Sequence, residues 1–131
     1  MVDQPKSDDF AIEVRHLRKE FGVLKAVDGI SFELKRGEFL SVFGPNGAGK
    51  TTLIKILAGL TRPSSGTARV AGYEVEESRS GMRREIGVIS HSTALYADLT
   101  SMENLIFFGK MYGLERPDES ALAVLEDVGL A

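Results

Sequence analysis

Nine consecutive residues have the types and spacing of a loop that binds phosphate. They run from Gly44 to Thr52, read GPNGAGKTT, and match the pattern G-x-x-x-x-G-K-[ST]. Because glycine adopts backbone angles that a Cβ would forbid, such a loop can wrap around an anion and present successive N–H groups to it. A helix that begins at the loop adds the positive end of its dipole. The pattern therefore predicts a site for the phosphates of a nucleotide.

Three side chains of this loop have a predicted chemical role. The ammonium group of Lys50 can reach the β- and γ-phosphate oxygens, so this lysine is also a candidate catalytic residue. The hydroxyl of Thr51 can ligate Mg²⁺, and Thr52 is expected to donate a hydrogen bond to the α-phosphate. The predicted nucleotide-binding residues of the loop are Gly44, Pro45, Asn46, Gly47, Ala48, Gly49, Lys50, Thr51 and Thr52.

The flanking sequence supplies the context that the motif requires. Residues 39–43 are apolar and predict a strand that stops at Gly44. From about Gly49 the apolar spacing i, i+3, i+4, i+7 predicts an amphipathic helix. Its apolar positions are Leu53, Ile56, Leu57 and Leu60. At average residue usage, chance gives the motif on the order of once per 25,000 positions, so an accidental match in a glycine-rich turn is disfavoured.

Alternating patterns elsewhere in the first 90 residues predict further strands. Residues 10–15 and 30–34 predict two half-buried antiparallel strands, and residues 67–70 and 86–90 predict two more. Asp28 and Gly29 have the chemistry of a tight hairpin turn, but a glycine inside one long strand fits nearly as well. Both interpretations stay open.

The remainder of the chain predicts two helices. The first begins at Ser101, which can cap it, and ends near Gly113; the second opens at Pro117 and stops at Gly129. Their apolar positions are Leu105, Phe108 and Tyr112 in the first helix and Leu122, Leu125 and Val128 in the second. The charged residues 76–85 are interpreted as a solvated face.

Length and composition narrow the possible partners. The 131 residues are the size of one domain, and a formal charge of −3 without a basic block disfavours nucleic acid. The absence of cysteine suits a reducing compartment, with the cytoplasm as the default. No uncharged run approaches the roughly 20 residues that span a bilayer, so membrane association is expected only through a partner. Residues 1–9 are expected to form a disordered polar tail.

Outside the loop as well, the chain resembles the ATP-binding subunits of ABC (ATP-binding-cassette) transporters. The loop of that family reads G-x-x-G-x-G-K-[ST]-T-L, as residues 44–53 do. The other segments that agree, in order, are residues 12–17 with Phe21 and Gly22, 27–34 before Gly37 and Glu38, 57–60, 63–66, Gly72 and 86–113. Unrelated P-loop kinases or GTPases are not expected to match outside the loop.

This resemblance implies an α/β fold over residues 10–131. The fold would be a P-loop NTPase core with an antiparallel β subdomain and the beginning of a helical subdomain. The resemblance also implies ATP and Mg²⁺ as ligands, and ATP hydrolysis by the full-length subunit. The implied partners are a transmembrane permease subunit and a second ATPase subunit in a head-to-tail dimer. The implied location is cytoplasmic, on the inner face of the cell membrane and bound there through the permease.

Two further site residues come from the resemblance. Phe21 lies 23 positions before Gly44, where family members carry the aromatic residue on which adenine stacks; a core role is the alternative. His91 stands where the family has a glutamine that reaches the magnesium and the attacking water. A neutral imidazole can ligate metal, whereas a protonated one is unfavourable beside Mg²⁺. His91 is thus a candidate catalytic and metal-binding residue, with an exposed loop histidine as the alternative.

The segment after His91 implies a partner surface and a possible cargo. Family members seat a short permease helix there, against an apolar lip that would be formed by Leu95, Tyr96, Leu99 and Met102. A histidine at this place is similar to the ATPase subunit of the haem exporter used in cytochrome c maturation, so haem is a candidate cargo. Many drug, lipid and polysaccharide exporters share several of the same residues.

Four motifs that the family needs for hydrolysis do not occur in these 131 residues. They are the Leu-Ser-Gly-Gly signature, an acidic strand end that holds magnesium, a general-base glutamate and a switch histidine. We expect an N-terminal part of a longer subunit, truncated before these motifs and able to bind nucleotide without turning it over. The alternatives are a soluble ABC protein of translation or DNA repair, a P-loop kinase or GTPase, and a folding or interaction module.

Overall fold

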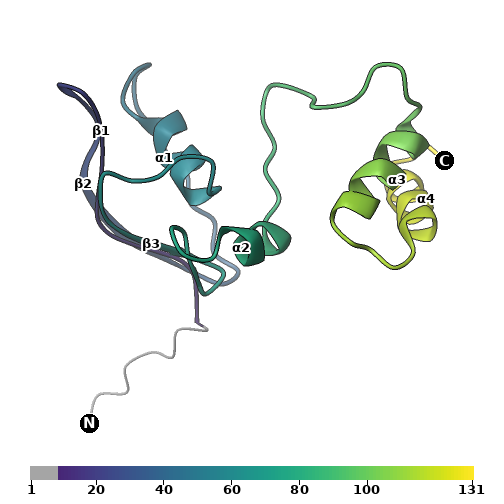
Figure 1. Ribbon diagram of the computed structural model, residues 1–131, viewed down its shortest axis with the longest axis horizontal. Helices are drawn as coiled ribbons and strands as arrows, with labels where there is room; N and C mark the ends of the chain where they lie inside the picture. The colour runs from purple at the N-terminus through teal and green to yellow at the C-terminus, as the bar shows by residue number, and fades with distance from the viewer. Residues whose placement is uncertain (1–8) are drawn as a thin grey trace, which may run out of the picture. The chain divides into compact units, whose positions relative to one another are not determined.

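The computed structural model describes residues 9–131, which fall into two compact units, residues 9–88 and Ile89–Ala131 (Figure 1). Each unit is described by itself. The disordered tail predicted for residues 1–9 lies outside the described residues except for Asp9.

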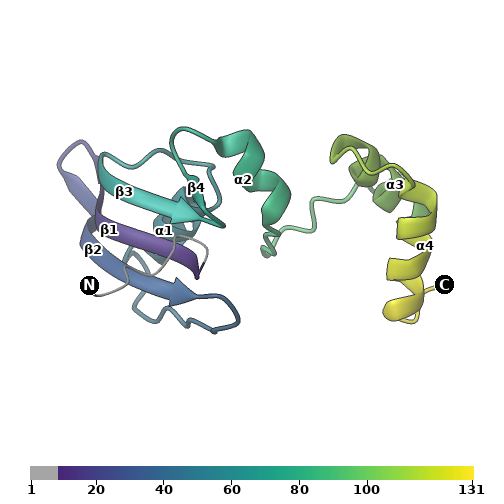
Figure 2. The same cartoon turned by 90° about the horizontal axis from the view of Figure 1, so that it is seen from below.

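A four-stranded antiparallel sheet dominates the first unit, in the order β2-β1-β3-β4 (Figure 2). Its strands are β1 (Phe10–Phe21), β2 (Leu24–Lys35), β3 (Ser65–Val70) and β4 (Tyr73–Glu74). The antiparallel pair predicted at residues 10–15 and 30–34 is confirmed, and both strands extend well beyond the alternating segments. A tight turn at Gly22, with φ of 60°, joins them.

The two interpretations of Asp28 and Gly29 are now distinguished. Both residues lie inside β2, so the hairpin-turn interpretation is wrong and the long-strand alternative holds. Gly29 has φ of 71°, a conformation that a residue with a Cβ rarely adopts. It stands beside a register shift between β1 and β2, which is where strand glycines commonly occur.

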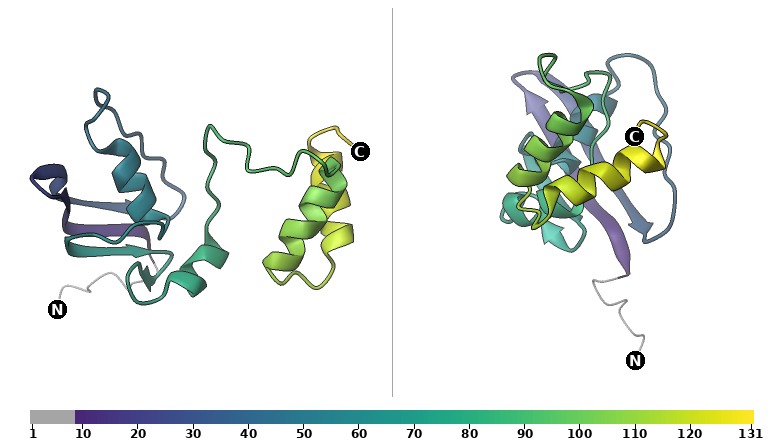
Figure 3. Two further views of the ribbon diagram at one scale, coloured as in Figure 1. Left: turned by 45° about the horizontal axis from the view of Figure 1, so that its top comes forward. Right: turned by 90° about the vertical axis from the view of Figure 1, so that its right-hand side faces the viewer.

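Helix α1 (Lys50–Leu57) packs on one face of this sheet (Figure 3). Leu53 and Ile56 are buried, as the helical spacing predicts, and Leu57 is half-buried. The core cluster of buried residues is Val14, Leu17, Val27, Leu53, Ile56, Ala68, Val70, Val75 and Met82. The helix ends before Gly59, whose φ of 69° reverses the chain. Leu60 therefore lies beyond the helix and is exposed, contrary to the prediction.

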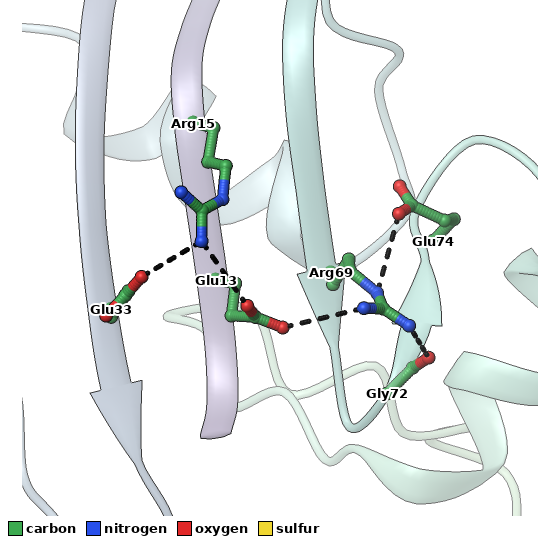
Figure 4. Close-up of polar contacts among 6 residues, drawn as sticks. All are labelled: Glu13, Arg15, Glu33, Arg69, Gly72 and Glu74. Carbon is green, nitrogen blue, oxygen red and sulfur yellow. Dashed lines mark hydrogen bonds and ion pairs between the residues drawn. The ribbon is translucent and has the colours of Figure 1, made fainter. Parts of the chain in front are cut away.

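The opposite face of the sheet carries a network of charged side chains (Figure 4). Glu13 and Glu33 face each other across β1 and β2, and Arg15 reaches both carboxylates, at 3.8 Å and 3.2 Å. Arg69 of β3 links Glu13 at 3.8 Å to Glu74 of β4 at 3.4 Å. Each such pair contributes little on an exposed surface. The network distinguishes the polar face of the sheet from the face that α1 covers.

The charged stretch at residues 76–85 contains a short helix that the sequence did not predict. Helix α2 spans Arg79–Glu85, and its Met82 is fully buried in the core cluster. Arg83 Nη2 donates a 2.9 Å hydrogen bond to the carbonyl oxygen of Gly59, which follows α1. Most of the charged side chains in this stretch are exposed, as predicted, whereas Arg79 is half-buried and Met82 anchors the stretch in the core.

Two predicted strands are not formed. Residues 39–43 and 86–90 pair with no strand among the described residues, although both segments are strongly apolar. Phe39 and Phe43 are about nine-tenths exposed, and Ile89 is fully exposed. The reason is physical: a strand needs a neighbouring strand to satisfy its N–H and C=O groups, whatever its own propensity.

The second unit contains the two predicted helices, α3 (Ser101–Met111) and α4 (Pro117–Asp127). The cap of α3 is Thr100, not Ser101. The Thr100 hydroxyl accepts from the Glu103 backbone N–H, and the Glu103 carboxylate accepts from the Thr100 backbone N–H in return. These hydrogen bonds from Thr100 lower the pKa of the Glu103 carboxyl. Gly113 and Gly129 follow the helices with positive φ, as predicted for their ends.

Helix α1 offers a matched pair of isoleucines that tests this core. Ile56→Ala removes a fully buried side chain, so we expect the free energy of unfolding to fall by about 2–4 kcal/mol. Ile54→Ala, on the exposed side of the same helix, should change it by less than about 0.5 kcal/mol. Urea unfolding followed by circular dichroism measures both. Equal losses would mean that α1 does not pack on the sheet through Ile56.

Candidate nucleotide-binding site

The glycine-rich loop leads directly into α1, with Gly49 as the residue before the first helical position. Gly47 and Gly49 have φ of 84° and 89°, so both use the freedom that glycine provides. The orphan N–H groups of the first turn of α1 therefore follow the loop without interruption. This is the arrangement that places donors and the positive helix end around an anion.

Gly49 also lies against β2 so closely that no side chain fits. A Cβ built on it would come within 1.9 Å of the carbonyl oxygen of Ala26. Gly47 has nothing within 4 Å of the same virtual position. The loop is thus held against the beginning of β2 at Gly49, and its tip at Gly47 is open.

The Lys50 side chain folds back over the loop. Its ammonium donates hydrogen bonds to the carbonyl oxygens of Gly44 and Pro45, the second at 2.6 Å. Lys50 is half-buried, so the charge is held over the cradle and does not extend into solvent. An ammonium has three donors, and it can exchange a carbonyl for a phosphate oxygen with little movement.

A cavity of about 300 Å³ opens between the loop and the β1–β2 hairpin. It is lined by Phe21, Leu24, Ala26, Asn46, Gly47, Gly49, Lys50, Thr51 and Thr52. The structure therefore brings Phe21 together with six of the nine predicted loop residues. Gly44, Pro45 and Ala48 belong to the same loop but do not line the cavity.

Leu24 and Ala26 are lining residues that the sequence did not identify. Leu24 is the cross-strand partner of Phe21, at the end of the hairpin, and is 62% exposed. The strand pairing could have identified Leu24. Once Gly22 is placed in the turn, Leu24 lies opposite Phe21 and shares its surroundings.

His91 lies in the second unit, in a bend, and its side chain is exposed. Its predicted contact with magnesium and the attacking water stays a prediction. Within residues 9–131 no three histidine, cysteine or acidic side chains gather as metal ligands. Magnesium in nucleotide sites is commonly held by one or two protein oxygens together with phosphates and water, so the Thr51 hydroxyl at the cavity fits such a role.

The predicted permease-docking segment forms a preorganised loop within the second unit. Asn104 is 3% exposed and accepts a 2.9 Å hydrogen bond from the Tyr96 backbone N–H. Its amide nitrogen donates to the carbonyl oxygens of Tyr96, Leu99 and Thr100 at 3.0–3.1 Å. The Tyr96 ring packs edge to face on the Phe107 ring, with centroids 5.1 Å apart. The loop therefore contacts α3 through its backbone, at Asn104, and through the Tyr96 side chain.

A strand hairpin, a glycine loop that leads into a helix, and a lysine over that loop define a P-loop nucleotide-binding protein. The family described as ABC transporter matches residues 27–131, and the chain belongs to this family.

Curated relatives support the same family. The chain is 43% identical over 113 residues to the doxorubicin resistance ATP-binding protein DrrA of Mycobacterium tuberculosis, which is 85% of this chain and 34% of the relative. It is 42% identical over 121 residues to the linearmycin resistance ATP-binding protein LnrL of Bacillus subtilis, 91% of this chain and 39% of the relative. The chain thus spans roughly a third of the length of these relatives.

Solved structures show the fold. An ATP-binding subunit of an ABC transporter superposes with a TM-score of 0.79 at 30% identity, over 92% of this chain and 51% of that one. A dimeric ATP-binding cassette bound to ADP and Pi matches with a TM-score of 0.73 at 24% identity, over 88% and 56% of the two chains. The predicted α/β fold of the P-loop NTPase class is therefore confirmed. Among residues 9–131, no helix combines the length and the apolar character that crossing a membrane requires.

Gly49 and Gly47 make a matched test of the loop. Both φ angles are strained for alanine, so Gly47→Ala should lower the free energy of unfolding by about 1–2 kcal/mol. Gly49→Ala adds a collision with the Ala26 carbonyl and should cost about 1–3 kcal/mol more. Thermal unfolding of the two variants measures the difference. Similar costs for both would contradict the close approach of the loop to β2.

Proposed function

We propose that this chain is the Mg-ATP-binding part of an ABC transporter ATPase subunit that drives export. The observation that carries the proposal is the cavity between the hairpin and the loop, which joins an aromatic ring, a glycine cradle and a half-buried lysine. Phe21 would stack on the adenine, and the N–H groups of the loop and of α1 would receive the phosphates. Lys50 would exchange a loop carbonyl for the β- and γ-phosphate oxygens, and Thr51 would hold Mg²⁺.

Export is favoured by what the relatives are named for. Besides the doxorubicin and linearmycin resistance proteins, a Nod factor export ATP-binding protein of Burkholderia lata is 40% identical over 111 residues, 85% of this chain and 36% of that protein. None of these three names mentions haem, so they favour an exporter of another cargo over a haem exporter. In the full-length subunit, ATP hydrolysis would use Lys50 to stabilise charge that develops on the phosphates.

The partners follow from the same proposal. A permease subunit would dock on the loop that Asn104 fastens, where Leu95 and Tyr96 are more than half exposed. A second ATPase subunit would complete the nucleotide site in a head-to-tail dimer. The subunit would then lie on the cytoplasmic face of the membrane, held there by the permease.

The loop chemistry is tested by removing its cation. Lys50→Ala should weaken Mg-ATP binding at least several-fold, because it removes the ammonium held over the cradle. Lys55→Ala, which removes a lysine from the last turn of the same helix, should leave the affinity within about twofold. Isothermal titration calorimetry measures the Mg-ATP affinity of the parent chain and of the two variants. Equal affinities of all three would contradict the proposed function.

The role of His91 is tested in the complete subunit assembled with its permease. His91→Gln replaces an imidazole by an amide that can also position water, so ATP turnover should be retained. His91→Ala should lower it at least several-fold. Steady-state ATPase assays of the parent subunit and the two variants measure both effects. Unchanged turnover in His91→Ala would make His91 a loop residue without a part in hydrolysis.

A further inference from the structure

The aromatic ring at the nucleotide cavity has a cation on it. The Lys19 ammonium lies 5.0 Å from the centroid of the Phe21 ring, within the range of a cation–π interaction. The two residues are two positions apart at the end of β1, on either side of a register shift between Lys19 and Glu20. Leu17, two positions earlier, is fully buried in the core beneath α1.

The backbone at this end of β1 is held on both sides. Toward β2, Lys19 pairs with Val27 and Phe21 pairs with Leu24. On the other side, the Ser64 backbone N–H donates to the Arg18 carbonyl oxygen at 2.8 Å, and the Ser64 hydroxyl accepts from the Glu20 backbone N–H at 2.9 Å. The backbone from residue 18 to 21 is therefore fixed by the sheet.

The Phe21 ring is not fixed in the same way. It stands at the last position of the strand beside the turn, and the residue is 53% exposed. A half-exposed aromatic side chain can rotate about χ1 among its staggered rotamers. The Lys19 contact adds a preference for the rotamer in which the ring meets the ammonium.

The cation is not part of the cavity wall. Phe21 lines the cavity, and Lys19 is not among the lining residues. Within residues 9–131 no carboxylate lies at ion-pair distance from Lys19. No ion pair of the described residues therefore draws the ammonium away from the Phe21 ring.

We infer that Lys19 is a positioning residue for nucleotide binding, which holds the Phe21 ring in the orientation that receives the base. The inference rests on the proposed function, because it needs a base in this cavity. Lys19 acts through Phe21 and does not contact the phosphates. The loop and Lys50 bind the phosphates.

The test separates the base from the phosphates by using two probes, Mg-ATP and magnesium tripolyphosphate. Lys19→Met keeps the apolar stem and removes the charge, and it should weaken Mg-ATP binding about two- to fivefold, the range of an exposed cation–π contact. It should leave tripolyphosphate binding unchanged. Lys19→Arg keeps a cation over the ring and should bind Mg-ATP as the parent chain does. Lys25→Met, at an exposed lysine of the same hairpin that does not line the cavity, controls for the loss of charge.

A double-mutant cycle completes the experiment. In a Phe21→Leu background, Lys19→Met should have no further effect on Mg-ATP, since the ring is gone. The inference is overturned if Lys19→Met matches Lys25→Met on Mg-ATP, if both probes weaken equally, or if the effect persists without the ring. Failure of the parent chain to bind either probe would overturn the proposed function together with this inference.

Discussion

The close approach of Gly49 to the Ala26 carbonyl is the contact on which the site depends. It joins the loop to the beginning of β2, and β2 is joined to Phe21 through the hairpin. The phosphate cradle and the aromatic ring come from segments more than twenty residues apart, and this contact holds them across one cavity. Burial of Leu53 and Ile56 then fixes the direction of α1, so that its first turn follows the cradle. A side chain at position 49 would separate the two halves of the site.

Local features of the sequence predicted most of the site. The glycine loop before a helix, the buried positions Leu53 and Ile56 of α1 and the strands at residues 10–15, 30–34 and 67–70 each depend on neighbours within a few residues, and these have the expected structure. Phe21 was found only through the family resemblance, since one aromatic residue carries no periodic signal. Leu24 and Ala26 could not be assigned, because they reach the cavity through the register of a long hairpin with several irregularities.

Some of the wrong predictions have a cause in tertiary context, and one has a local cause. Residues 39–43 have high strand propensity, but a strand exists only where another backbone pairs with it. Helix α2 was not predicted, because Met82 is its one buried residue and the other residues around it are mostly charged. A single apolar residue does not make a periodic pattern. The cap of α3 was displaced by one residue because Thr100 and Ser101 are both good capping residues. The reciprocal bond with Glu103, which stands three positions after Thr100, decides between them.

The two unpaired apolar segments also bear on how the chain behaves in solution. Residues 39–43 and 86–90 present extended backbone and exposed Phe39, Phe43 and Ile89 with no strand of the described residues beside them. Such a segment is a template for any strand that it meets, including the same segment of another copy. We therefore expect association between copies of this chain to involve these two segments more than the charged surface of the sheet. Charged substitutions that improve solubility belong there, away from the hairpin and the loop.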